Sequence, residues 1–174
     1  MNNGDSMKKI LVILIASIIM NLSVFSEANY VIRVQTDGAK LKVPLYNEKT
    51  LVLYDNASTE TKTFTGLEDL GDLDLIECYP LPYIESYDFL ADVKSCKSIY
   101  LGYAHYFDFN ILKNVKNLEE IDFEGFISEE DFQEIKRNGI DVSELKYLKK
   151  LIFNPAGYTI DFDLKIKYAE DVFE

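Results

Sequence analysis

The stretch Leu112-Lys-Asn-Val115-Lys-Asn-Leu118-Glu-Glu-Ile121-Asp-Phe123 decides the fold of this chain. Its apolar residues are spaced three, three, three and then two apart. A spacing of three is typical of a helical turn, and a spacing of two is typical of a strand with one buried face. The same order of spacings is found in three other stretches: Phe64, Leu67, Leu70, Leu73 and Leu75; Leu90, Val93, Cys96, Ile99 and Leu101; and Val142, Leu145, Leu148, Leu151 and Phe153.

These stretches predict a repeated unit in which a turn leads into a short strand. One such unit cannot bury its apolar edge alone, whereas stacked units share a continuous core. The sequence therefore predicts an α/β fold with a parallel sheet of about five strands, one strand from each unit. The expected strand anchors, at steps of 22, 26, 22 and 30 residues, are Leu51 (in a degenerate first copy), Leu73, Ile99, Ile121 and Leu151.

The unit resembles that of the leucine-rich repeat family, whose pattern is L-x-x-L-x-L-x-x-N/C over about 20–29 residues. Leu70, Leu73, Leu75 and Cys78 match this pattern best, and the resemblance covers residues 48–156. It implies a short, divergent leucine-rich-repeat-like solenoid in a protein of bacterial character. An ordinary α/β domain with βα units of similar length is the alternative. In the later copies, the positions where the family has Asn or Cys carry Ala104, Phe126 and Ala156.

The segments on either side of the repeats are expected to cover the ends of the core. Residues 29–47 alternate apolar and polar residues around Thr36-Asp-Gly38 and predict an N-terminal β-hairpin cap. Residues 157–174 carry Ile160, Phe162, Leu164 and Ile166 in alternation and predict a C-terminal cap of one or two strands. Inside the longest step, Ser128 and Asn138-Gly139 bracket a predicted α-helix.

Residues 1–28 have the pattern of a secretory signal peptide, with two lysines before an apolar run and small residues near Ala28. The run from Ile10 to Met20 is shorter than the roughly 20 residues that a membrane span needs. We therefore expect cleavage after Ala28, export to the periplasm, the cell surface or the medium, and no membrane span in the mature protein. An uncleaved anchor is the alternative, and Met7 is a second candidate start. Two buried free thiols are expected at Cys78 and Cys96.

The composition excludes several classes of function. The 174 residues carry a net charge of −12, and all of it falls on residues 29–174, so nucleic acid is not an expected partner. His105 is the only histidine, which leaves no Ser-His-Asp, Cys-His or zinc-binding arrangement, and no phosphate-binding loop occurs. We therefore expect no cofactor, no metal and no enzymatic activity, although a carboxylate-dependent surface hydrolase remains an alternative.

Between the inward positions of each predicted strand, the sequence places residues that face solvent on the concave sheet of the resembled fold. Acids there surround an aromatic residue, a combination suited to binding a protein partner with a basic surface. A solvated acidic face, or a structural envelope protein without a defined ligand, is the alternative. The predicted binding residues are Asp72, Asp74, Ser98, Tyr100, Glu120 and Asp122.

Overall fold

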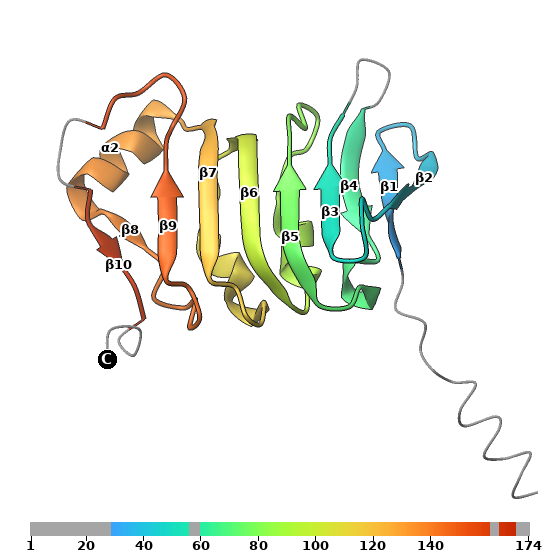
Figure 1. Cartoon of the computed structure of the whole chain (residues 1–174). Helices are drawn as coiled ribbons and strands as arrows, with labels where there is room; N and C mark the ends of the chain where they lie inside the picture. The colour runs from blue at the N-terminus through green and yellow to red at the C-terminus, as the bar shows by residue number, and fades with distance from the viewer. Residues whose placement is uncertain (1–28, 56–59, 161–163, 170–174) are drawn as a thin grey trace, which may run out of the picture.

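The computed structural model describes residues 29–55, 60–160 and 164–169 and has a mixed α/β architecture (Figure 1). At its centre lies a five-stranded parallel sheet of order β3-β5-β6-β7-β9. The predicted α/β class and the parallel sheet of about five strands are therefore confirmed. The strands are β3 (Thr50–Leu53), β5 (Leu73–Cys78), β6 (Cys96–His105), β7 (Glu120–Phe126) and β9 (Lys150–Phe153).

The register of the sheet corrects one predicted strand anchor. Ile76, and not Leu73, pairs with Ile99 and with Leu51. The apolar run Leu67, Leu70, Leu73, Ile76 and Cys78 has the same spacings as the other units, and all five residues are buried. The prediction placed the inward positions of this strand three residues too early, because Leu73 and Leu75 are two residues apart, as Ile76 and Cys78 are. The buried row across the sheet, with steps of 25, 23, 22 and 30 residues, is Leu51, Ile76, Ile99, Ile121 and Leu151.

Short 3₁₀ turns precede three of the strands: η1 (Leu67–Asp69), η2 (Asp88–Asp92) and η3 (Phe109–Asn114). Apolar residues three apart fit a 3₁₀ turn, in which side chains at i and i+3 share one face. Each turn ends in the same backbone hydrogen bond, which the N–H of an apolar residue donates to the carbonyl oxygen three residues earlier. The donor–acceptor pairs are Leu70 and Leu67, Val93 and Leu90, Val115 and Leu112, and, before β9, Leu145 and Val142.

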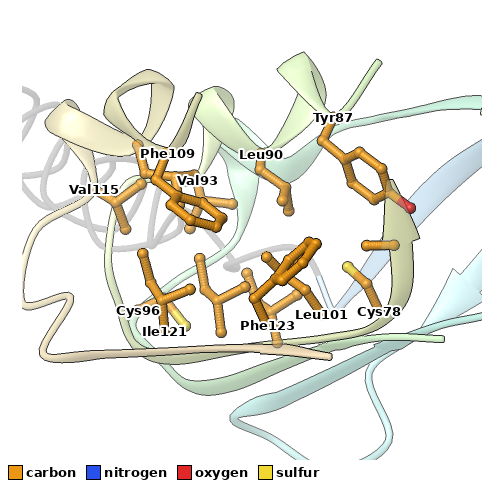
Figure 2. Packing of buried hydrophobic residues seen from close by; sticks show 14 of the residues in the cluster. Cys78, Tyr87, Leu90, Val93, Cys96, Leu101, Phe109, Val115, Ile121 and Phe123 are labelled. Carbon is orange, nitrogen blue, oxygen red and sulfur yellow. The ribbon is translucent and has the colours of Figure 1, made fainter. Parts of the chain in front are cut away.

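The hydrophobic core lies between the sheet and these turns. Figure 2 shows Ile121 and Phe123 of β7 facing Val93 and Phe109 of the turns. The ring centroids of Phe109 and Phe123 are 5.8 Å apart, and those of Phe123 and Phe153 are 5.2 Å apart. Among the described residues, the core thus fills one face of the sheet, and no such layer covers the opposite face. Cys78 and Cys96 are buried and free within it, as predicted.

The N-terminal segment forms the predicted hairpin, β1 (Tyr30–Gln35) and β2 (Lys40–Pro44). Its turn uses Gly38 at a φ of 86°, a conformation that glycine adopts without steric cost. A third strand, β4 (Thr61–Thr65), completes an antiparallel sheet of order β2-β1-β4. Since β4 lies within residues 48–156, this sheet extends beyond the boundary predicted for the hairpin.

Arg33 joins this antiparallel sheet to the parallel one. Its side chain is buried, and Nη2 donates a hydrogen bond of 2.5 Å to the carbonyl oxygen of Tyr54, just after β3. The guanidinium carbon also lies 5.8 Å from the ring centroids of Tyr54 and Phe64. One polar side chain therefore fixes the carboxyl end of β3 against β1 and β4.

The C-terminal part contains the predicted helix, α2 (Glu129–Asn138). Ser128 caps it, because its Oγ accepts a hydrogen bond of 3.0 Å from the N–H of Asp131, and Gly139 ends it. The predicted C-terminal strand is only two residues long in the described part: β10 (Ile166–Lys167) pairs in parallel with β8 (Ile140–Asp141). Phe162 and the predicted signal peptide, residues 1–28, lie outside the described residues.

A candidate binding surface on the outer face of the sheet

The face of the parallel sheet opposite the 3₁₀ turns, here called the outer face, carries half-buried and exposed side chains in the described part of the chain. Because side chains alternate between the two faces of a strand, the residues between the buried positions belong to this face. Two of its rows cross all five strands. The first row is Thr50, Leu75, Ser98, Glu120 and Lys150, and the second is Val52, Glu77, Tyr100, Asp122 and Ile152.

Four of the six predicted binding residues lie together on this face. Ser98 pairs with Glu120, and Tyr100 pairs with Asp122, on the adjacent strands β6 and β7. In the sequences of these two strands, only one choice of inward-facing residues fits the apolar spacing. The predicted register is therefore confirmed where it rests on β6 and β7.

The placement of Asp72 and Asp74 in these rows is wrong. The three-residue shift in β5 puts Leu75 and Glu77 at the positions predicted for them. Asp74 instead lies at the amino end of β5, where its Oδ1 is 2.6 Å from Lys97 Nζ. This ion pair lowers the pKa of Asp74 below its usual value. Both acids are exposed, and neither contributes to the surface around Tyr100.

Tyr100 is held in one orientation by its neighbours. Its hydroxyl donates a hydrogen bond of 3.0 Å to Glu124 Oε2, and its ring centroid lies 5.8 Å from that of Tyr79 in an edge-to-face arrangement. The ring also lies over Gly102, where an added Cβ would come within 2.8 Å of it. Partial burial, together with the Glu124 carboxylate, raises the pKa of Tyr100 to about 12. The phenol therefore stays protonated and available as a preorganised aromatic contact.

Asp122 is the polar group on this face whose hydrogen bonding is incomplete. Among the described residues, its Oδ1 is buried and has no hydrogen-bond partner. Desolvation, followed by repulsion from Glu124 and Glu120, raises the pKa of Asp122, while Lys150 acts in the opposite direction. Lys150 itself is 2.8 Å from Glu120 Oε1. A buried carboxylate oxygen without a donor costs free energy, and a cation brought to this face would offset part of that cost by attraction to the carboxylate.

Two residues of the surface, Glu77 and Tyr79, are not among those predicted from the sequence. Both lie on the outer face once β5 is aligned on Ile76 and Cys78. The apolar run that ends in those two residues was therefore the sequence pattern that could have predicted them. Glu124 also faces outward, in the next row, where it pairs with Gly102. The corrected surface, named the acidic–aromatic surface below, consists of Glu77, Tyr79, Tyr100, Glu120, Asp122 and Glu124.

Three other observations bear on the kind of site. His105 is an exposed residue at the end of β6 and packs against Phe126 with ring centroids 6.0 Å apart. Within residues 29–55, 60–160 and 164–169, no group of three or more His, Cys, Asp or Glu residues is arranged to hold a metal ion. In the same ranges, no helix has the length and apolar character needed to cross a membrane.

In comparisons with protein-family models, curated proteins and solved structures, no match to this chain was found.

Proposed function

We propose that this chain is a non-enzymatic protein-interaction module that binds a basic segment of a protein partner on its acidic–aromatic surface. The observation that carries the proposal is the carboxylate of Asp122, which has a buried oxygen without a donor beside the fixed ring of Tyr100. An ammonium or guanidinium group on this face would pair with the Asp122 carboxylate and offset its charge. The tyrosine rings offer both apolar contact and cation–π attraction to the same group.

The surrounding charge favours a cationic partner over other ligands. Glu120 and Glu124 flank Asp122 on β7, and Glu77 of β5 lies on the far side of Tyr100 in the same row. Complementary charge speeds the encounter with a basic segment and discriminates against acidic ones. The proposal therefore concerns a protein segment rich in lysine or arginine.

The finer architecture that we propose is a short leucine-rich-repeat-like solenoid. Its support is the backbone hydrogen bond that recurs after Leu67, Leu90, Leu112 and Val142, each time one unit further along the chain. In this arrangement, the β2-β1-β4 sheet covers one end of the core, while α2 and the β10-β8 pair cover the other. Solenoids of stacked units commonly use their sheet as an extended binding surface, and that comparison is by fold analogy.

We also propose that the protein acts outside the cytoplasm, on the strength of the signal-like residues 7–28. The partner would then be a periplasmic, cell-surface or secreted protein. Mass spectrometry of the exported protein should find a chain that begins at Asn29. A chain that keeps residues 7–28 would instead indicate an uncleaved anchor.

Peptide binding provides the direct test of the interaction function. A labelled peptide of alternating arginine and serine should bind the protein in a fluorescence anisotropy titration, and a peptide of alternating glutamate and serine should not. The variant Glu77→Gln with Asp122→Asn should weaken binding at least about tenfold, since it removes two carboxylates from the acidic–aromatic surface.

The matched control removes the same charge elsewhere. Asp72→Asn with Asp74→Asn takes two carboxylates from the amino end of β5 and should change affinity less than about twofold. Equal losses in the two double variants would mean that only net charge matters. That result would contradict a defined surface.

A further inference from the structure

A second group of exposed aromatic side chains lies beside the acidic–aromatic surface, where β6 and β7 end. Tyr103 is 58% exposed and Phe126 is 47% exposed, with ring centroids 6.1 Å apart. His105 pairs with Phe126 across the two strands and packs against its ring. We call Tyr103, His105 and Phe126 the aromatic cluster. Apolar rings gathered on a surface indicate an interaction site more often than single exposed ones do.

The backbone turns one of these rings outward. The pairing of β6 with β7 shifts between Gly102 and His105, and Tyr103 adopts a φ of 59°. This left-handed conformation is uncommon for a bulky residue and is strained relative to an ordinary strand conformation. Its consequence is that Tyr103 faces solvent while Gly102 and Ala104 on either side are buried.

The aromatic cluster and the acidic–aromatic surface are continuous along β7. Glu120, Asp122, Glu124 and Phe126 are two residues apart, so all four belong to the outer face in the regular strand alternation. Asp122 and Phe126 are four residues apart, which corresponds to about 13 Å along an extended strand. A partner segment that lies along β7 could therefore contact both with side chains about four residues apart.

We propose that the partner binds through a short extended segment that carries a basic residue and a large apolar residue about four positions apart. The basic residue would donate to Asp122, and the apolar residue would pack on Tyr103 and Phe126. This inference rests on the proposed function and adds to it a motif. Two anchors with different chemistry select a partner more sharply than positive charge alone.

Four synthetic peptides of equal length on a glycine–serine background test the motif. The first carries arginine and leucine four positions apart, the second has serine in place of leucine, and the third has serine in place of arginine. In the fourth, arginine and leucine are adjacent. Fluorescence anisotropy should show that the first peptide binds at least about tenfold more tightly than each of the others.

Variants of the cluster separate a binding role from a structural one. Phe126→Ala should weaken binding of the first peptide about fivefold to tenfold and leave the affinity for the second peptide, which lacks leucine, unchanged. Phe126→Leu should restore part of the lost affinity. Tyr103→Gly should weaken the same binding while raising the melting temperature, because glycine accepts the left-handed conformation. Tyr46→Ala and Tyr147→Ala, at residues 81% and 52% exposed elsewhere, should change nothing.

The outcomes distinguish this inference from the proposal beneath it. If all arginine peptides bind equally and Phe126→Ala has no effect, the motif is wrong while the basic-segment function stands. If the peptide that lacks arginine binds as tightly as the first and the peptide that lacks leucine does not bind, the cluster binds apolar segments and both proposals fail. If no peptide binds at all, the interaction function itself is contradicted.

Discussion

At the scale of single residues, Asp122 and Asp74 show how position changes the effect of one carboxylate. Asp74 has a lysine at 2.6 Å, which lowers its pKa, whereas desolvation and two neighbouring acids raise the pKa of Asp122. Folding therefore favours the ionised form of the first and the protonated form of the second. At neutral pH the negative charge of Asp122 therefore opposes folding.

The substitution Asp122→Asn should increase the free energy of unfolding at pH 7 and weaken binding of basic peptides. Since the folded-state pKa of Asp122 is raised, its favourable contribution is complete below the unfolded-state pKa and is lost as the pH rises through the folded-state value. The stability gain of the variant over the wild type should therefore be larger at pH 7 than at pH 3. Urea denaturation at both pH values measures it.

Asp74→Asn is the control with the opposite sign. The folded-state pKa of Asp74 is lowered, so its contribution is present above the unfolded-state pKa and disappears as the pH falls. This variant should lose stability relative to the wild type at pH 7 and match it more closely at pH 3. The same trend in both variants would mean that the surroundings of Asp122 do not oppose its charge.

At the scale of elements, the sequence predicted those strands whose apolar pattern has a single frame. In β6 and β7 a polar residue stands on each side of Ile99 and of Ile121, so the inward positions are unambiguous. In β5, Leu75 and Ile76 are adjacent, and both frames place an apolar residue at the anchor. Whether Leu73 or Ile76 is the inward anchor depends on where the preceding turns with apolar residues three apart end. Packing of β5 against β3 and β6 decides this. The left-handed Tyr103 could not be predicted either, because neither glycine nor asparagine marks it.

The β5 register can be tested by a pair of alanine substitutions. Ile76→Ala should cost about 2–5 kcal/mol of unfolding free energy, because Ile76 is fully buried in the row between Leu51 and Ile99. Leu75→Ala should cost less than about 1 kcal/mol, since Leu75 is half-exposed on the outer face. Urea denaturation with a shared m-value gives both numbers. A larger loss for Leu75→Ala would restore the originally predicted frame.

At the scale of the whole molecule, negative charge is distributed unevenly along the chain. Residues 29–65 carry five Lys or Arg and four Asp or Glu, a net charge of +1, whereas residues 66–174 carry 11 and 24, a net charge of −13. The parallel sheet from β5 onward and its outer face lie in the acidic part. Like charges on one compact body repel each other, and the same field attracts a basic partner.

Salt should therefore change stability and binding in opposite directions. When sodium chloride is raised from 50 to 500 mM, the Debye length falls from roughly 14 to about 4 Å, which screens both effects. We expect the urea midpoint to rise, because repulsion among the carboxylates weakens, and the affinity for the arginine peptide to fall at least about tenfold. Urea is the required denaturant, since guanidinium chloride is itself a salt. If stability falls with salt instead, exposed ion pairs such as Lys150–Glu120 outweigh the repulsion. In that case, the acidic half of the molecule is balanced internally and would exert little long-range attraction on a basic partner.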